Sequence, residues 1–221
     1  MKRIIVPIDF SHYSENAFYS AAKIASKSDA TITCLNVVQS DLDWANLSAS
    51  EKEKNQEILD LEAEAKDKLK AFIATHKIKN TPVEAVVEIG VPYQVLVDIA
   101  YKQKADLIVI GAYGKNREPG KFVGSTTQKV FRNAHCPVLA VKNIVDGRAM
   151  KKLVFASLFN EISKPAFIRL KPFIKSIRTV VYFLFVNTPE NFIDTHKAEE
   201  RMGEYAYGQE ELLIHRHIYN H

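Results

Sequence analysis

The chain alternates short apolar runs with longer stretches in which apolar residues recur every three or four positions. Short apolar runs are typical of buried strands, and they predict strands at residues 2–8, 31–38, 82–89, 107–110 and 137–141. Apolar residues at helical spacing predict helices at residues 17–25, 51–76, 92–100 and 125–133. Strand and helix therefore alternate along residues 1–145.

This alternation predicts an α/β fold, with a five-stranded parallel sheet and helices on both of its faces. In such sheets, ligands bind outside the carboxyl ends of the strands, at the switch in strand order. Asp9, Val37 and Gly111 all fall at predicted carboxyl ends, so we expect a ligand site where these ends meet.

Three glycines follow the fourth predicted strand and lead into the fourth predicted helix. The spacing is glycine, two residues, glycine, nine residues, glycine, and it comprises Gly111, Gly114, Gly124 and the following Ser125 and Thr126. Glycine lets a backbone approach a phosphate closely, and a helix N-terminus offers free N–H groups and a partial positive charge. The segment therefore predicts a phosphate-bearing ligand, above all a nucleotide.

The chain also contains an internal repeat. Residues 151–163 align without gaps on residues 2–14, and residues 180–186 align on residues 31–37. A repeat of this length indicates a second copy of the module, with a third strand expected at residues 212–219. Leu158 stands in place of Asp9 and the glycine segment has no counterpart, so we expect an incomplete copy without a second nucleotide site.

The glycine spacing resembles the ATP-binding motif of the universal stress protein family. Residues 4–11 resemble the first strand and turn of that family, and residues 135–141 resemble its last strand. The resemblance implies a Rossmann-like fold of the adenine-nucleotide alpha-hydrolase type. It implies a nucleotide-binding domain at residues 1–145 and an incomplete second domain of the same family at residues 149–221.

The same resemblance implies the residues of the site. Asp9 matches the acidic residue that contacts adenosine, and Val37 matches the residue whose backbone faces adenine. The full expected set is Pro7, Asp9, Val37, Gly111, Gly114, Gly124, Ser125 and Thr126. A carboxylate accepts from hydroxyl and amino groups and repels phosphate, which places Asp9 at the nucleoside end. Capping of the following helix by Asp9 is the alternative, beside Ser11 and Ser14 as candidate caps.

Some positions leave the interpretation open. Ala112 and Tyr113 stand where family members often have a polar residue and histidine. The basic residues of the nine-residue interval either contact phosphate or belong to a solvated loop; they are Lys115, Arg117 and Lys121.

Two functions from different classes remain. The first is an ATP-binding protein of stress response or signalling, non-catalytic or at most a very slow ATPase, with Mg²⁺ left open. Phosphoryl transfer needs a metal-binding acid and a water-positioning group, and neither is evident beside Gly124. The second is a ligand-free interaction module acting through an unknown protein partner. The strand at 137–141 is expected at a sheet edge, where the family resemblance implies a homodimer.

The charge and the apolar runs exclude several classes of function and location. The net charge of +4 is too small to indicate nucleic-acid binding, and no apolar run reaches membrane-spanning length. The N-terminus does not resemble a signal peptide, so we expect a cytoplasmic protein.

Cys34 and Cys136 are expected as reduced thiols, Cys34 in the core. Surface histidines are favoured over a metal site for His215, His217 and His221.

Overall fold

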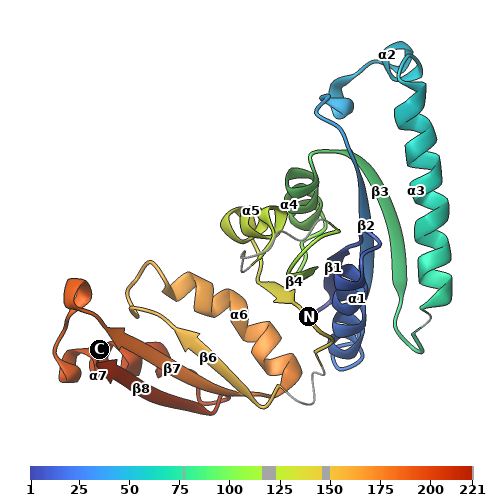
Figure 1. Ribbon diagram of the computed structural model, residues 1–221. Helices are drawn as coiled ribbons and strands as arrows, with labels where there is room; N and C mark the ends of the chain where they lie inside the picture. The colour runs from blue at the N-terminus through green and yellow to red at the C-terminus, as the bar shows by residue number, and fades with distance from the viewer. Residues whose placement is uncertain (77, 116–122, 146–149, 221) are drawn as a thin grey trace. The chain divides into compact units, whose positions relative to one another are not determined.

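The fold is taken from a computed structural model of the chain, which describes residues 1–76, 78–115, 123–145 and 150–220. The chain divides into two compact units, residues 1–146 and residues 147–221. Each unit has its own parallel sheet (Figure 1).

The first unit contains a five-stranded sheet in the order β3-β2-β1-β4-β5. Its strands are β1 (Arg3–Pro7), β2 (Thr31–Gln39), β3 (Val83–Gly90), β4 (Leu107–Gly111) and β5 (Val138–Val141). Every neighbouring pair is parallel, which confirms the predicted fold class. The strand order reverses between β1 and β4, and β5 lies at an edge, as the sequence predicted.

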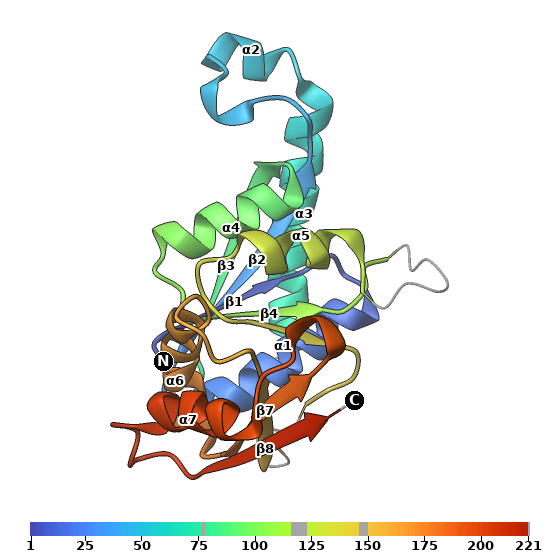
Figure 2. The same cartoon turned by 90° about the vertical axis from the view of Figure 1, so that its left-hand side faces the viewer.

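Helices cover both faces of this sheet, namely α1 (His12–Ala25), α3 (Gln56–Thr75), α4 (Pro92–Lys102) and α5 (Ser125–Asn133). The short helix α2 (Ala49–Glu53) packs against α3, and a 3₁₀ turn lies at Trp44–Asn46. Figure 2 shows α4 and α5 on one side of β1 and β4, and α1 on the other. On the α4 and α5 side, Leu96 and Val130 pack against Ile5, Leu35 and Ile108.

The single helix predicted at residues 51–76 is wrong, because the chain breaks between α2 and α3. Asn55 has a non-helical backbone, with φ −103° and ψ 52°. Its side-chain amide donates to the carbonyl of Glu51 at 2.8 Å. Asparagine competes with the helix for backbone hydrogen bonds in this way, and no apolar residue between Ala49 and Ile58 marks a helix face across the break.

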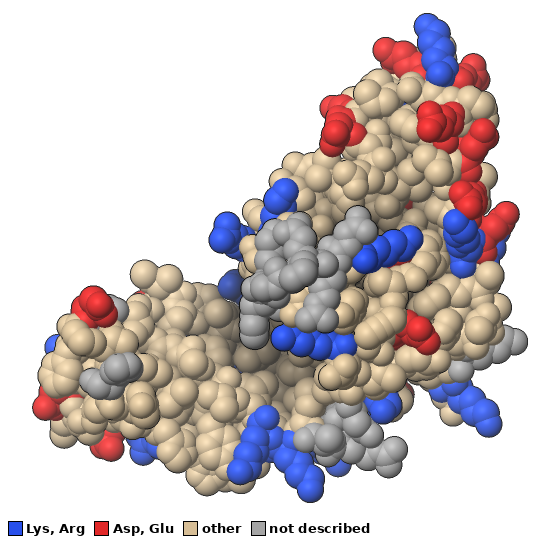
Figure 3. All heavy atoms as spheres, in the orientation of Figure 1, with Lys and Arg blue, Asp and Glu red and all other residues tan. Residues whose placement is uncertain are grey.

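The charged residues of this region form a solvated surface. Figure 3 shows acidic side chains gathered over α2 and the first turns of α3. Further along α3, Glu62 pairs with Lys66 at 2.7 Å and Glu64 pairs with Lys68 at 2.5 Å. Exposed pairs four residues apart support a helix only weakly, so packing against the sheet holds α3 in place.

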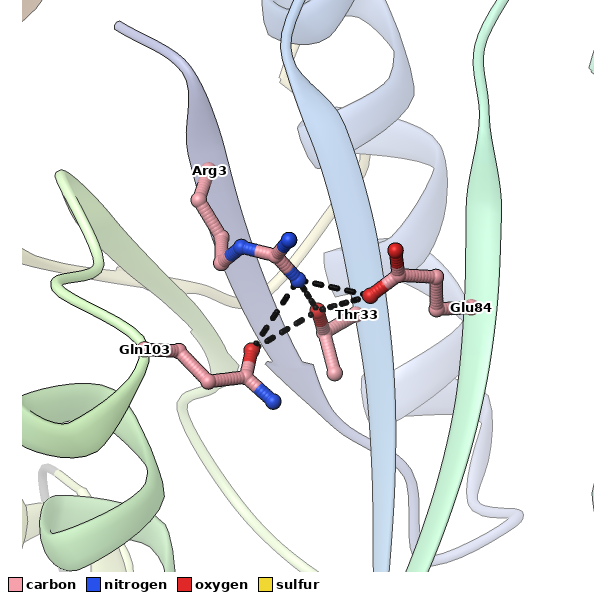
Figure 4. Close-up of polar contacts among 4 residues, drawn as sticks. All are labelled: Arg3, Thr33, Glu84 and Gln103. Atoms are coloured by element: carbon pink, nitrogen blue, oxygen red, sulfur yellow. Dashed lines mark hydrogen bonds and ion pairs between the residues drawn. The ribbon is translucent and has the colours of Figure 1, made fainter.

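Four side chains connect three strands to the end of α4 at the amino ends of the strands (Figure 4). One guanidinium nitrogen of Arg3 donates to Glu84 at 2.6 Å, to Thr33 at 2.9 Å and to Gln103 at 3.2 Å. Thr33 is fully buried. The cluster joins β1, β2 and β3 to the C-cap of α4, at the end of the sheet opposite the predicted site.

The second unit contains a smaller sheet in the order β6-β7-β8. Its elements are β6 (Lys152–Ala156), α6 (Lys164–Ile177), β7 (Val180–Asn187), a 3₁₀ turn at Pro189–Asn191, α7 (Thr195–Ala206) and β8 (Ile214–Asn220). The core joins Phe183 and Phe185 of β7 to Phe167 of α6 and Met202 of α7. The strands are parallel and follow the order of β1, β2 and β3.

The backbone repeats at the same positions as the sequence. Phe10 and Phe159 both have positive φ, 63° and 48°, just after β1 and β6. Asp29 and Arg178, before β2 and β7, have φ of 51° and 52°. Such values are uncommon for residues other than glycine. Both pairs lie 149 positions apart, the spacing of the sequence repeat. This agreement fits a partial second copy of the first unit.

Candidate functional site

A cavity of about 740 Å³ opens at the carboxyl ends of the strands of the first unit. The end of β1, the end of β2, the glycine segment after β4, the first turn of α5 and one face of α3 line it. The lining includes every residue that the sequence predicted for the site, namely Pro7, Asp9, Val37, Gly111, Gly114, Gly124, Ser125 and Thr126. Its volume falls within the ~300–1,000 Å³ that is typical of small-molecule sites.

Asp9 connects the turn after β1 to the glycine segment. Its Oδ1 accepts from the N–H of Ser11 at 3.0 Å and from the Ser11 hydroxyl at 2.5 Å. Its Oδ2 accepts from the N–H of Lys115 at 3.1 Å. Because β1 and β4 are neighbours in the sheet, the two loops meet. The carboxylate therefore lies beside the glycine segment. It is nearer to this segment than we expected from the assignment of Asp9 to the nucleoside end.

Ser11, rather than Asp9, caps α1. The Ser11 hydroxyl oxygen accepts from the N–H of Ser14 at 3.2 Å, which is the geometry of an N-cap. The capping role considered for Asp9 is therefore wrong. Of the two serine candidates for the cap, the structure selects Ser11.

The three glycines have different surroundings. A Cβ on Gly111 would come within 2.9 Å of the backbone of Tyr13, and one on Gly114 would come within 3.2 Å of Asp9 Oδ2. A Cβ on Gly124 would meet nothing closer than the carbonyl of Ala112 at 3.6 Å, an ordinary contact. None of the three has a left-handed backbone. Gly111 is thus required by the packing of α1, while the described surroundings of Gly124 leave room for a side chain.

Helix α5 begins at the cavity, and the N–H groups of its first turn have no side-chain acceptor. Gly124 occupies the N-cap position, and no side chain among the described residues accepts a hydrogen bond from the first turn. Free N–H groups and the helix dipole favour an anion at such an end. The buried Thr127 hydroxyl donates to the carbonyl of Gly111 at 3.0 Å, and the N–H of Gly124 donates to Ala112 at 2.8 Å. These bonds hold the helix start against the end of β4.

Asn36 is a residue of the cavity that the sequence analysis missed. It is buried, lines the cavity beside Val37, and donates from its amide to the carbonyl of Ile8 at 2.7 Å. The bond ties the end of β2 to the end of β1. A polar residue inside the otherwise apolar run 31–38 was the available signal, because such a residue needs a specific partner when buried.

The wall formed by α3 was also missed. Leu61, Glu64, Ala65 and Lys68 line the cavity from this helix. Nothing in the local pattern distinguishes these residues from the rest of an amphipathic helix, so only the tertiary arrangement identifies them.

The structure describes the surroundings of Tyr113 and Lys115, two of the positions whose role the sequence left open. Tyr113 is buried, and its ring meets Tyr13 edge-on at 5.2 Å. The ammonium of Lys142 lies 5.6 Å from the same ring. The ammonium of Lys115 lies 5.6 Å from the ring of Phe10. The other two basic positions, 117 and 121, lie outside the described residues.

The histidines of β8 contact an aromatic ring. His215 and His217 stack against Tyr182 of β7, with ring centroids 5.0 Å and 5.5 Å away; position 221 lies outside the described residues. Among the residues that the structure describes, no three His, Cys, Asp or Glu side chains gather as a metal site would require.

Both cysteines are free thiols. Burial raises the pKa of Cys34 to about 12. Burial, with a smaller contribution from the negative charge of Asp106, raises the pKa of Cys136 to about 11. Cys34 is in the core, as predicted. None of the described helices combines the length and apolar character needed to span a bilayer.

The sheet order and the cavity beside its topological switch define a Rossmann-like α/β protein. Comparison with known protein families then identifies the family. The sequence model of the universal stress protein family matches residues 1–142, and the chain belongs to this family.

Individual relatives agree with this assignment. A universal stress protein of Methanocaldococcus jannaschii is 34% identical over 149 residues, covering 64% of this chain and 82% of that protein. The structure of universal stress protein UspA from Lactobacillus plantarum is 34% identical, with a TM-score of 0.52 over 64% of this chain and 97% of that one. A universal stress protein from Archaeoglobus fulgidus, 15% identical, is similar in fold alone, with a TM-score of 0.66 over 99% of this chain and 78% of that one.

Proposed function

We propose that the domain at residues 1–145 binds an adenine nucleotide, ATP above all, and acts in stress response or signalling in the cytoplasm. The observation that carries this proposal is the uncapped N-terminus of α5 opening into a cavity of about 740 Å³. The family membership and the glycine spacing support it independently. The incomplete copy at 149–221 has no counterpart of the glycine segment and takes no nucleotide in this proposal.

The phosphates are assigned to the start of α5. The N–H groups of Ser125 and Thr126 and the Ser125 hydroxyl supply donors, and Gly124 allows close approach. The nucleoside is assigned to the other side of the cavity, near Pro7 and Val37. Asp9 Oδ2 has one described donor, Lys115, and a carboxylate oxygen has room for a second. A ribose hydroxyl is the donor we assign to it.

Hydrolysis is at most very slow in this proposal, and Mg²⁺ is left to experiment. The carboxylates of the cavity lining are Asp9 and Glu64. Asp9 accepts three hydrogen bonds from protein groups and Glu64 pairs with Lys68. Phosphoryl transfer needs an acid to hold the metal ion and a group to position water. A multiple-turnover rate of about 1 per second, at the low end for ordinary enzymes, would overturn this part of the proposal.

A ligand-free interaction module is the second candidate, and one observation favours it. Strand β5 lies at the sheet edge, and an edge strand presents backbone groups to another chain. A homodimer through this edge, acting on an unknown protein partner, is the form we assign to that function.

Gly124→Asp separates the two candidates, because it changes binding and stability in opposite directions. An aspartate at the N-cap accepts from the first turn and complements the helix dipole, which stabilises the fold by about 0.5 kcal/mol. The same carboxylate repels phosphate and occupies its donors, so ATP affinity should fall on the order of 100-fold. Titration calorimetry measures the affinity, and urea unfolding measures the free energy of unfolding.

Ser48→Asp is the matched control, because Ser48 is the N-cap of α2 and does not line the cavity. It should leave ATP affinity unchanged. If Gly124→Asp binds ATP as the wild type does, the phosphates do not lie at α5. If the wild-type chain binds no adenine nucleotide at all, the interaction module becomes the better conclusion.

A further inference from the structure

Asn36 presents an amide oxygen to the cavity. The residue is only 8% exposed, and it lines the cavity. Its NH₂ group donates to the carbonyl of Ile8 at 2.7 Å, and its oxygen accepts from no described donor. Among the described residues, the fully buried side-chain atoms without a hydrogen-bond partner are Thr81 Oγ1 and Gln209 Oε1. The Asn36 oxygen is therefore not fully buried, and the cavity is the space that it faces.

The bond to Ile8 determines which way the amide of Asn36 is turned. A carbonyl only accepts hydrogen bonds, so exchanging the nitrogen and the oxygen would set two acceptors against each other. Polar atoms of buried residues are nearly always hydrogen-bonded to protein, water or ligand. This position of the cavity therefore offers a fixed acceptor, which selects a ligand group that donates.

Asn36 lies at the end of the cavity that we assign to the nucleoside. It precedes Val37 on β2, and its partner Ile8 follows Pro7 at the end of β1. Pro7 and Val37 are the residues beside which the nucleoside is placed. The donor that meets the Asn36 oxygen should therefore come from the base or the ribose, and not from the phosphate end.

Beside Asn36 the cavity continues towards α3. Side chains alternate across a strand, so Asn36 and Val38 share one face of β2. Val38 packs with Ala65 of α3, which lines the cavity. The charged residues of this wall, Glu64 and Lys68, pair with each other at 2.5 Å. A ligand group that reaches Asn36 therefore meets a neutral acceptor with cavity space along α3 next to it.

We propose that Asn36 determines base specificity, by accepting a hydrogen bond from the exocyclic amino group of adenine, and that this group is directed towards α3. The assignment, which rests on the proposed nucleotide binding, names the edge of the base that the chain reads. Asparagine accepts from the same amino group when it reads adenine in DNA. A 6-oxo purine has an acceptor at this position, which would leave the Asn36 oxygen without a donor.

Titration calorimetry of the full chain with a series of nucleotides tests the assignment. N⁶-benzyl-ATP keeps one N–H and should bind about as tightly as ATP, because its substituent lies in the space along α3. N⁶,N⁶-dimethyl-ATP has no N–H, and ITP has an oxygen in place of the amino group. Each of these two should bind at least about tenfold more weakly than ATP. The benzyl group is larger than two methyl groups, so this order cannot result from size.

Asn36→Leu removes the acceptor at similar side-chain volume. ATP should then bind at least about tenfold more weakly, with the same affinity as N⁶,N⁶-dimethyl-ATP. Asn16→Leu is the matched control, because Asn16 also donates to a backbone carbonyl, that of Lys142 at 2.9 Å, and does not line the cavity. It should leave the ratio of the two affinities unchanged. A loss of stability alone would not change this ratio, because both nucleotides are measured on the same protein.

The outcomes separate this assignment from the proposed function. Tight binding of ATP without discrimination against N⁶,N⁶-dimethyl-ATP and ITP would overturn the role of Asn36 and leave nucleotide binding standing. Discrimination that persists in Asn36→Leu would assign the amino group to another acceptor. Weak binding of N⁶-benzyl-ATP would show that the amino group faces a closed wall. Absence of binding by every nucleotide would overturn both proposals. The wild-type series tests the assignment even if Asn36→Leu does not fold.

Discussion

Individual side chains here take their chemistry from burial more than from charged neighbours, and the two thiols are the clearest case. Cys34 is fully buried in β2 and Cys136 is partly buried before β5. Removing water from around a thiolate disfavours it, which raises both pKa values above that of a free cysteine. The reactive form of either thiol is therefore scarce in the folded protein.

We expect both thiols to resist modification while the protein is folded. With a pKa of about 11, roughly one Cys136 in 10³ is a thiolate at pH 8, and Cys34 is in addition out of contact with solvent. A disulfide reagent such as DTNB should react slowly with the native chain and release two equivalents in urea. Cys136→Ala assigns the remaining signal to Cys34.

The pH dependence of the modification rate tests whether the thiolate is the reacting form. Each unit rise in pH should speed the native reaction about tenfold until the pKa is approached, because the thiolate is the attacking species. Stoichiometric reaction of Cys136 within seconds at pH 8 would contradict the burial described for it.

The sequence predicted which residues meet at the cavity better than it predicted their hydrogen-bond partners. Asp9, Gly111 and Gly124 were expected at the ligand site, and all of them line one cavity. The contact of Asp9 with Lys115 was not predicted, because it joins loops more than a hundred residues apart and depends on which strands are neighbours. Hydrogen bonds across a sheet are set by topology, which local residue patterns do not encode.

At the scale of elements, the closeness of α1 to β4 depends on one glycine. A Cβ at Gly111 would lie 2.9 Å from the main chain of Tyr13, and main chain cannot move aside as the end of a long side chain can. The helix and the strand are therefore packed at a separation that only glycine permits.

Gly111→Ala should destabilise the chain by about 1–3 kcal/mol, the usual cost of overpacking a tight core. The free energy of unfolding in urea, followed by circular dichroism, measures the loss. Gly203→Ala in α7 is the control: its Cβ would meet only the far end of Arg216, at 3.3 Å, and alanine favours a helix interior. It should stabilise by about 0.5–1 kcal/mol. Equal effects of the two substitutions would show that the contact with Tyr13 relaxes freely.

Element boundaries show where sequence patterns stop being informative. The strands were predicted within one or two residues, because buried parallel strands are nearly continuous apolar runs. The break at Asn55 was missed, although residues 50–57 contain no apolar residue and a side-chain hydrogen bond of Asn55 interrupts the backbone. The helix predicted at residues 51–76 rested on an apolar spacing that begins at Ile58, and this spacing gives no information on the residues before it.

At the scale of the whole molecule, the repeat relates the two units. Its sequence signal predicted a second copy, and the matching positive φ values at Phe10 and Phe159 fit that interpretation. The apolar pattern does not distinguish Val154 from Ile5, its counterpart in the repeat, although Val154 is 59% exposed and Ile5 is fully buried. Apolar character alone therefore does not determine whether a strand position is buried.

Two units with separate cores should also respond separately to a ligand of one of them. If ATP binds the first unit, ATP at 100 times its dissociation constant stabilises that unit by about 2.7 kcal/mol. Amide hydrogen exchange in β1 and β4 should then slow on the order of 100-fold where it proceeds by opening of the unit. Exchange in β7 should not change, because the proposal places no nucleotide in the second unit.

Gly124→Asp under the same ATP concentration is the control, and its β1 and β4 should exchange as they do without nucleotide. Mass spectrometry of peptides from β1, β4 and β7 gives the rates within a single experiment. Equal slowing of β7 would mean that the units open together, which would contradict the proposed division near residue 147. Slowing in β7 alone would place the nucleotide on the second unit, against the assignment of the phosphates to the start of α5.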